Sequence, residues 1–287
     1  MPGRLIERPL ATSLAEVLAT PRSKSPRIFW LGQAGFVLDI AGRRIVVDPY
    51  LSDSLAEKYR GTPRPHVRMM PPPVVPDAIA HVDLVCCTHA HTDHMDPGTL
   101  PKLLAANPNA RLLAPRAMRQ QALERSGLDE AHLMLTDAGE TLDLGDGLSI
   151  IPTRAAHETL EQDAEGHHRF LGYAIRAEGV TLWHSGDCIP FDGLVEDISK
   201  LRPQIALLPV NGRRPELSLN GVPGNFTLSE AADIAHDVGV ETMVAHHYGL
   251  FDFNTIDPVT IDDLAREERT LQIVRAREAI AFEWSAT

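Results

Sequence analysis

Three histidines and two aspartates fall within eight residues of this chain, in the run THAHTDHMD at residues 88–96. The run directly follows residues 82–87, a short apolar segment bounded by polar residues, which is typical of a strand buried on both faces. A loop that leaves such a strand can turn several side chains towards one small volume. Since imidazole and carboxylate groups are ligands for divalent metals, the feature indicates a sheet whose core strand ends at a metal-binding loop.

The remaining chain alternates strand-like and helix-like segments. Short runs of Val, Ile and Leu separated by glycines predict a β-meander over residues 27–47. Further strands are expected at residues 111–114, 141–144, 148–153, 170–176, 180–183, 205–210, 242–245 and 280–284, and helices at 98–106, 116–126, 194–201, 227–237 and from 261. Two β-then-α halves without a low-complexity linker predict one α/β domain over residues 27–287, with two sheets and helices outside.

Two segments fall outside this alternation. Residues 1–26 are expected to form an N-terminal arm, with a short helix around residues 13–19 that is broken by Pro21 and Pro26. The segment 51–80, whose prolines all lie in the loop at residues 61–76, is so rich in proline that a regular helix or strand is excluded. It is therefore a linker, a lid or part of a site wall, and its position soon after Asp48-Pro49-Tyr50 favours the wall.

Composition argues against several classes of protein. The chain has 287 residues, and its 27 Lys and Arg against 39 Asp and Glu give a formal charge of −12, which repels polyphosphate, so nucleic acid is not an expected partner. No apolar run approaches the roughly 18–20 residues of a membrane span. Three cysteines cannot form a disulfide framework, and residues 1–26 lack a secretory signal, so a cytoplasmic protein is expected. Nothing in the sequence determines the oligomeric state, and a homo-oligomer remains open.

An open catalytic metal site needs donors beyond the 88–96 run. The candidates follow other predicted strands: His157 after 148–153, Asp187 after 180–183, and His246 or His247 after 242–245. Together with the first loop they would offer imidazole and carboxylate ligands, which suit Zn, Mn, Fe or Co.

These positions resemble the metal-binding motifs of the metallo-β-lactamase superfamily in order and spacing, and the resemblance runs from about residue 27 to the C-terminus. Within the superfamily, the segments WLGQAGF (30–36), DPY (48–50) and WHSGD (183–187) look like the L-ascorbate-6-phosphate lactonase branch. The resemblance implies an αββα sandwich with a dinuclear site at the sheet edge. One metal would be held by His89, His91 and His157, and the other by Asp93, His94 and His247, with Asp187 bridging both.

The segment His247-Tyr248-Gly249 resembles the family pattern, so His247 is preferred to His246 as the ligand. Two divalent ions, zinc or manganese, would lower the pKa of a shared water from about 15.7 towards 7 and make a bridging hydroxide the nucleophile. Asp93 would orient that hydroxide and pass a proton to the leaving group.

Other residues have two interpretations each. Asp48 either fixes an imidazole tautomer or forms a turn before Pro49. His184 is expected to brace Asp187, and His246 to be a packed histidine or a support of the ligands. The neighbouring arginines Arg213 and Arg214 suggest recognition of a phosphate or carboxylate in this acidic protein, with a solvated loop as the alternative. Tyr50 and Tyr248 are candidates for the pocket wall.

The leading functional hypothesis is a metal-dependent hydrolase acting on a small anionic ester, above all a lactone of a sugar acid or a related carboxylic acid. A phosphodiesterase for small molecules or cyclic nucleotides would use the same site on another substrate. A non-hydrolytic iron-dependent or thiol-linked enzyme of the same superfamily is the third interpretation.

Overall fold

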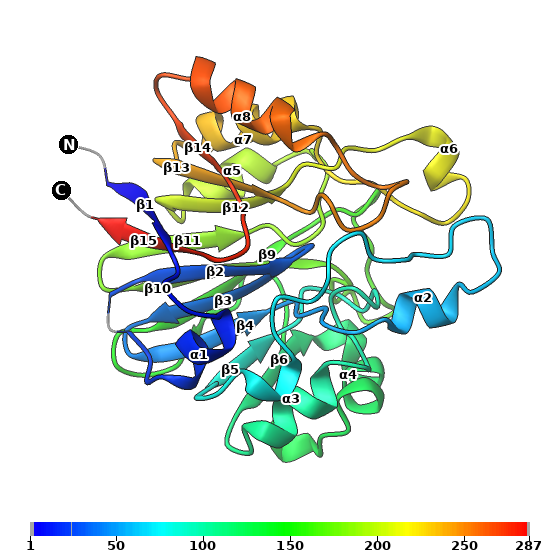
Figure 1. The fold of residues 1–287 in the computed structure, drawn as a ribbon. Helices are drawn as coiled ribbons and strands as arrows, with labels where there is room; N and C mark the ends of the chain where they lie inside the picture. The colour runs from blue at the N-terminus through cyan, green and yellow to red at the C-terminus, as the bar shows by residue number, and fades with distance from the viewer. Residues whose placement is uncertain (1–2, 24, 286–287) are drawn as a thin grey trace.

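Two β-sheets form the centre of the structure, and helices cover their outer faces (Figure 1). The computed structural model describes residues 3–23 and 25–285. The first sheet has the strand order β1-β15-β2-β3-β4-β5-β6-β7, and the second has the order β14-β13-β12-β11-β10-β9-β8. The predicted αββα sandwich is therefore confirmed.

The first sheet combines a meander with parallel strands. Strands β2 (Arg27–Gly32), β3 (Gly35–Ile40) and β4 (Arg43–Val47) pair antiparallel, as the short glycine-containing turns predict. Strands β5 (Leu84–Cys86), β6 (Arg111–Pro115) and β7 (Leu133–Thr136) continue in parallel from β4, connected through helices α3 (Leu100–Ala106) and α4 (Arg119–Ser126).

The second sheet has the same two parts. Strands β8 (Leu142–Asp143), β9 (Ser149–Arg154), β10 (Leu171–Ala177) and β11 (Val180–His184) pair antiparallel. Strands β12 (Ile205–Pro209), β13 (Thr242–His246) and β14 (Gln272–Arg275) follow β11 in parallel. Helices α5 (Leu194–Ser199), α7 (Leu228–Val238) and α8 (Pro258–Glu267) make the crossovers, and α7 begins with the predicted capping box of Thr227 and Glu230.

The prediction of a separate N-terminal arm is wrong, because β1 (Arg4–Pro9) pairs with β15 (Ile280–Ser285) at the edge of the first sheet. The sequence RLIERP hides this strand, since only Leu5 among its side chains is buried. The predicted short helix is present as α1 (Leu14–Ala19). Three shorter elements complete the description: α2 (Ser54–Lys58), α6 (Pro215–Ser218) and a 3₁₀ turn at Pro76–Ala78. The prediction that residues 51–80 contain no regular helix is wrong at α2, because the prolines of this segment begin only at Pro63.

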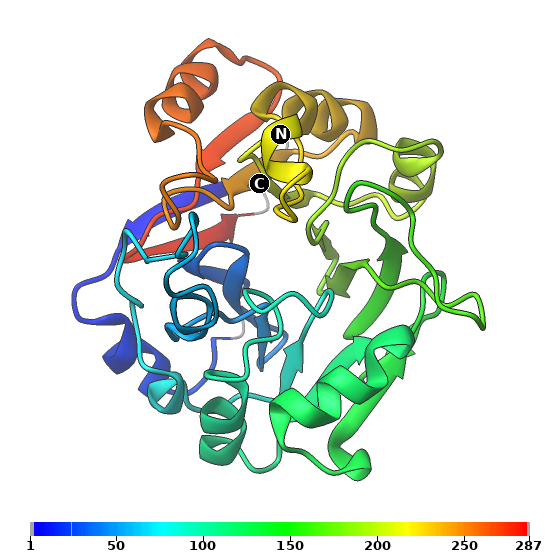
Figure 2. The same cartoon turned by 90° about the vertical axis from the view of Figure 1, so that its right-hand side faces the viewer.

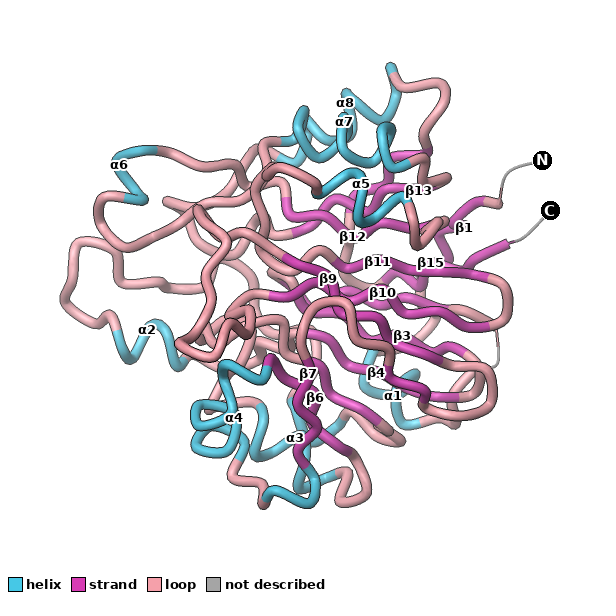
Figure 3. The backbone as a smooth tube through the Cα atoms, turned by 180° about the vertical axis from the view of Figure 1, so that it is seen from behind, coloured by secondary structure: helices cyan, strands magenta, loops and turns pink. Residues whose placement is uncertain are grey.

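The loops that follow β4, β5, β11, β12 and β13 leave the two sheets at the same end of the molecule, opposite the two chain termini (Figures 1 and 3). Figure 2 looks directly onto this end. Buried strands hold the loops in place, because every residue of β5, β11, β12 and β13 lies in the core. No helix among the described residues is long and apolar enough to cross a membrane.

Candidate metal centre

All seven predicted metal ligands meet at this end of the sheets. Four come from the loop after β5, and one each follows β9, β11 and β13. Their ligand atoms form three groups, each with its atoms within 4.8 Å of one another: His89, His91 and His157; His89, His94 and Asp187; and Asp93, His94 and His247. The convergence arises because the carboxyl ends of the strands that precede the loops lie at one edge of the sandwich.

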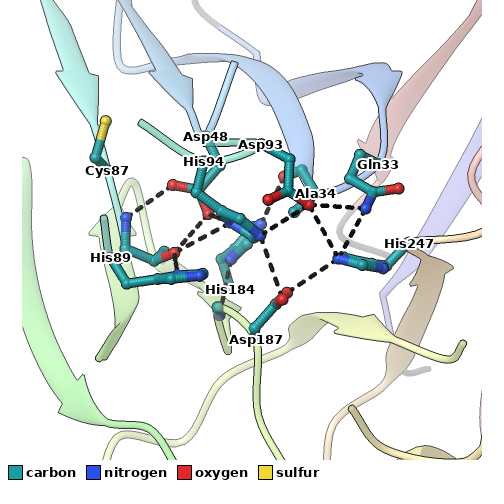
Figure 4. A network of polar contacts seen from close by, with 12 residues as sticks. Gln33, Ala34, Asp48, Cys87, His89, Asp93, His94, His184, Asp187 and His247 are labelled. Atoms are coloured by element: carbon teal, nitrogen blue, oxygen red, sulfur yellow. Dashed lines mark hydrogen bonds and ion pairs between the residues drawn. The ribbon is translucent and has the colours of Figure 1, made fainter. Parts of the chain in front are cut away.

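Asp187 lies between the other ligands (Figure 4). Its Oδ2 is 3.3 Å from Nε2 of His94 and 3.6 Å from Nε2 of His157. Its Oδ1 is 3.3 Å from Nε2 of His247. One carboxylate therefore faces imidazoles of both proposed ligand sets, which is the arrangement that a bridging ligand requires.

Several of these buried atoms have no hydrogen-bond partner. They include Nε2 of His89, Nε2 of His94 and Oδ1 of Asp187. Buried polar atoms in proteins are normally paired, and two imidazole nitrogens beside a carboxylate oxygen are a donor set that divalent cations prefer. The residues therefore fit a metal centre.

Asp48 sets the orientation of two of the histidines. It is fully buried, and its Oδ2 lies 2.7 Å from Nδ1 of His94, so Nδ1 carries the proton and Nε2 is free to bind a metal. Thr88 donates its hydroxyl to the same Asp48 oxygen at 2.6 Å and its backbone N–H to Oδ1 at 2.7 Å. The Thr88 hydroxyl then accepts from Nδ1 of His89 at 3.0 Å, which leaves Nε2 of His89 free as well. Sequence analysis missed Thr88, although it directly precedes the histidine run.

The electrostatics of the cluster suit cation binding. Burial lowers the pKa of His89 well below its usual value and lowers that of His157 to about 3, so both imidazoles are neutral and keep a lone pair. Burial opposes ionisation of Asp187, but His247 and His94 outweigh it and hold the pKa of this carboxyl well below its usual range. Burial also opposes protonation of His94, yet the three surrounding carboxylates hold its pKa well above the usual value. The carboxylates around His94 thus supply negative charge that a bound cation would compensate in place of the His94 proton.

Gln33 is a further member of the cluster, in the turn between β2 and β3. Its side-chain N–H donates to Oδ2 of Asp93 at 2.9 Å, and the same nitrogen lies 3.1 Å from Nε2 of His247 (Figure 4). Its backbone oxygen accepts from the backbone N–H of His247 at 3.0 Å. Gln33 is only 1% exposed and has a φ of +49°, a conformation that non-glycine residues seldom adopt. Residues 30–36 resemble the lactonase branch, but this resemblance does not predict the contact between Gln33 and Asp93.

His184 contacts the turn that carries Asp187, and its role in bracing Asp187 stays a prediction. Its Nε2 donates to the backbone oxygen of Ala34 at 2.9 Å, and its Nδ1 accepts from the backbone N–H of Gly186 at 3.0 Å. Gly186 has a φ of +64°, and a Cβ there would lie 2.5 Å from the backbone oxygen of Leu171. Only glycine fits this turn without displacing β10, and the turn delivers Asp187 to the site.

His246 belongs to none of the three ligand groups. It is fully buried, and its ring packs edge-on against Phe36 at a centroid distance of 5.2 Å. The ring of His184 also packs against the ring of His246, at a centroid distance of 5.1 Å. The structure thus agrees with the interpretation of His246 as a packed histidine.

A cavity of about 180 Å³ opens beside the ligands. One side is made of metal-ligand residues: His91, Asp93, His157, Asp187 and His247. The other residues that line it are Leu55, Lys58, Tyr59, His66, Ala90, Thr92, Arg125, Gly221, Val222, Pro223, Phe251 and Asn254. His66 lies in the proline-rich segment, so this segment lines the cavity, and its role as a wall of a substrate site stays a prediction.

The predicted arginine pair does not line this cavity. Arg213 instead forms two hydrogen bonds of 2.6 Å with the carboxylate of Glu230 at the start of α7. Arg214 donates to the backbone oxygen of Phe253 and lies 3.8 Å from a carboxylate oxygen of Glu216. The expected substrate contact is corrected, because Arg213 already pairs with Glu230 and Arg214 lies beside Glu216.

The two tyrosines are also absent from the cavity lining. Tyr50 is 1% exposed, and its hydroxyl accepts from the backbone N–H of Leu55. Tyr248 stacks on Trp30 at 5.3 Å and donates its hydroxyl to the backbone oxygen of Ala276. Both are structural residues, which corrects their expected place in the pocket wall. The basic residues that do line the cavity, Lys58 and Arg125, were not predicted.

Comparison with known proteins agrees with this picture. Residues 43–248 match the family model described as "Beta-lactamase superfamily domain". A "UPF0173 metal-dependent hydrolase" of Sulfolobus acidocaldarius is 30% identical over 193 residues, which are 66% of this chain and 73% of the relative. Another of the same description, from Aeropyrum pernix, is 28% identical and covers 90% of this chain and 98% of its own length. The solved structure of Igni18, a metallo hydrolase from Ignicoccus hospitalis, shares the fold with a TM-score of 0.67 at 20% identity, covering 92% of this chain and 99% of that chain.

Proposed function

The chain belongs to the β-lactamase superfamily domain family, and on that premise we propose that it is a metal-dependent hydrolase of small anionic esters. The substrate class that we propose is a lactone or related carboxylic ester, whose acid is a sugar acid or another carboxylic acid. The names of the relatives from Sulfolobus acidocaldarius and Aeropyrum pernix, both metal-dependent hydrolases, support the reaction class.

The observation that carries the proposal is the convergence of seven candidate ligands, among which His89, His94 and Asp187 each carry a buried, unpaired atom. His89, His91 and His157 would hold one divalent cation, and Asp187 would contact both cations. The second cation would be held by Asp93, His94 and His247. Such a cation pair supplies Lewis acidity and water that ionises near neutral pH. Zinc and manganese both accept these ligand types.

Asp93 is the residue that we propose to move the proton. It lines the cavity, its side chain keeps 16% of its surface exposed, and the side-chain N–H of Gln33 holds its Oδ2 in place. A carboxylate fixed in this way can accept a proton from the attacking water and return it to the leaving oxygen, provided that the substrate lies within hydrogen-bonding distance.

The charges around the cavity support an anionic substrate. Lys58 and Arg125 are the basic side chains among the described lining residues, and Asp93 and Asp187 are the acidic ones. With two divalent cations bound, positive charge exceeds negative charge in the cavity, which attracts a carboxylate or phosphate group. Arg125 is held in place by hydrogen bonds from its guanidinium to the backbone oxygens of Ala90 and Met95.

Reconstitution tests the proposal. Protein stripped of metal would be loaded with Zn²⁺ or Mn²⁺ and assayed on plain and phosphorylated lactones, on p-nitrophenyl acetate, and on bis(p-nitrophenyl) phosphate. We expect turnover of lactones or carboxylic esters that disappears in Asp187→Ala and persists in Asp163→Ala, a matched loss of a carboxylate outside the cavity. Turnover of the phosphodiester alone would replace the esterase proposal with the phosphodiesterase alternative.

A further inference from the structure

Aromatic rings are prominent among the cavity residues that are not candidate ligands. Three of these residues carry rings, Tyr59, His66 and Phe251, which we call the aromatic wall, and Leu55 and Val222 also line the cavity. The wall is assembled from distant parts of the chain, because Tyr59 follows α2, His66 lies in the proline-rich segment, and Phe251 follows β13. No single sequence motif encodes it.

The rings of the aromatic wall are packed in defined geometries. His66 stacks on Tyr59 with centroids 4.3 Å apart and planes inclined by 23°. It meets Phe251 edge-on at 5.1 Å and Phe253 edge-on at 4.8 Å. Stacked and edge-on contacts are the favoured arrangements of aromatic pairs. A small hydrophobic cluster that includes Tyr50 and Phe251 lies apart from the main core and supports the wall.

Hydrogen bonds hold the proline-rich segment against this cluster. The guanidinium of Arg68 donates to the backbone oxygens of Tyr50, Ser52 and Met70 at 3.1–3.3 Å. The backbone N–H of Met69 donates to the backbone oxygen of Leu250 at 2.9 Å. The aromatic wall is therefore formed before a ligand arrives, so little conformational entropy is lost when a ligand packs on it.

The wall is also uncharged near neutral pH. Nδ1 of His66 lies 2.7 Å from the backbone oxygen of Arg64 and so carries the proton of the neutral ring. Burial lowers the pKa of His66 below its usual value, an effect that Asp93 opposes and that Lys58 and Arg64 assist. The ammonium group of Lys58 lies over the Tyr59 ring, 5.0 Å from its centre. An anionic group and an apolar group thus find separate partners in one cavity.

A polyhydroxylated substrate suits this surface poorly. Hydroxyl groups placed against the carbon faces of the rings would lose water there without a hydrogen-bond partner on those faces, which costs free energy for each group. An aromatic or aliphatic body would instead gain from leaving water and from stacking on the rings.

We propose that the aromatic wall is the subsite for an apolar, preferably planar, substrate body, with the anionic group of the substrate near Lys58 and its ester group at the metal ligands. The inference rests on the proposed function and narrows it. The proposed function leaves the acid part of the lactone or ester as a sugar acid or another carboxylic acid, and the aromatic wall favours a carboxylic acid that is not a sugar acid. The substrate class is an aromatic or otherwise apolar lactone or ester that carries a carboxylate or phosphate.

Equilibrium binding tests the subsite without any turnover. Calorimetry on the metal-loaded protein would compare phenylphosphonate with methylphosphonate, two ligands of equal charge that differ in the apolar group. We expect phenylphosphonate to bind at least tenfold more tightly. The ratio of the two dissociation constants, methylphosphonate over phenylphosphonate, should fall below three in His66→Ala. It should stay near the wild-type value in His66→Phe, which keeps an aromatic ring.

Val67→Ala is the matched control, because Val67 is the next residue in the same segment and is 63% exposed. Its phosphonate ratio should equal that of the wild-type protein. Thermal unfolding identifies a variant that does not fold, in which case Tyr59→Leu replaces His66→Ala. Equal binding of the two phosphonates by the wild-type protein, or a ratio that neither wall variant changes, overturns the inference.

Hydrolysis separates the inference from the function on which it rests. Dihydrocoumarin, an aromatic lactone, would be compared with glucono-δ-lactone, a polyhydroxylated one, and we expect a higher kcat/KM for dihydrocoumarin that falls in His66→Ala through a higher KM. A preference for gluconolactone would refute the apolar subsite. Failure to hydrolyse either lactone, or any ester in the panel above, counts against the proposed function. In that case the binding of the two phosphonates alone tests whether the aromatic wall is an apolar subsite.

Discussion

Replacing Asp48 with asparagine should selectively weaken one of the two proposed metal positions. The side chains are nearly equal in size, so the buried volume at residue 48 is unchanged. The carboxylate contacts Nδ1 of His94 at 2.7 Å and accepts two hydrogen bonds from Thr88. Asparagine offers one oxygen in place of two and carries no charge, so His94 loses the ionised acceptor that fixes its tautomer.

The size of the effect follows from these contacts. A hydrogen bond to a charged group contributes about 1.5–3 kcal/mol, and each 1.4 kcal/mol corresponds to about tenfold in an equilibrium constant. We therefore expect about 10–100-fold weaker metal binding, which is the range typical of residues that support a histidine ligand. His94 belongs to the ligand set with Asp93 and His247, so the loss should fall on that cation first.

Competition with a chromogenic chelator would measure the two zinc affinities, and elemental analysis would measure the stoichiometry. Asp262→Asn is a suitable control, because Asp262 is an aspartate paired with Arg275 and does not line the cavity. If Asp48→Asn binds two zinc ions as tightly as the wild-type protein, the argument that Asp48 sets the His94 tautomer is refuted.

Four further predictions follow from the site and its surroundings. Gln33→Met removes the N–H that holds Asp93 and should lower kcat about tenfold, in line with loss of one hydrogen bond to a charged group, while circular dichroism stays unchanged. Gly186→Ala places a Cβ against the backbone of Leu171 and should lower the free energy of unfolding by about 1–3 kcal/mol, measured in urea. Arg213→Ala should leave KM unchanged and reduce stability by about 1 kcal/mol or less, because Arg213 pairs with Glu230 on a partly exposed surface. Zinc at 100 times its dissociation constant should raise the free energy of unfolding by about 2.7 kcal/mol over the chelated protein, which thermal or urea unfolding would detect.

The metal loop could be predicted because its information is local. The order of His89, His91, Asp93 and His94 directly after a buried strand specifies both the ligands and the place in the fold where they lie. Most strands of the sandwich could be predicted for a similar reason, since continuous apolar runs occur in strands that are covered on both faces. The sequence did not predict β1, β7 or β14. His157, Asp187 and His247 each follow such a strand, and all three lie at the site.

Edge pairing could not be predicted, because β1 finds its partner far away in the chain. The sequence of β1 carries three charged residues among six and offers one buried side chain, Leu5. Its backbone is nevertheless paired along its whole length with β15, from Arg4 opposite Ser285 to Pro9 opposite Ile280. Backbone hydrogen bonding of this kind leaves no hydrophobic pattern in the sequence.

Apart from the contribution of the proline-rich segment, the residues that line the cavity contrary to expectation were decided by tertiary structure. Arg213 and Arg214 are neighbours in sequence and looked like an anion site, but each is paired elsewhere, and Lys58 and Arg125 line the cavity instead. Gln33 reaches Asp93 across sixty residues of chain. Local sequence determines which residue types follow a buried strand and hence the metal ligands. Which side chains face those ligands across the cavity depends on how distant loops pack together, and that is set by contacts that no short segment contains.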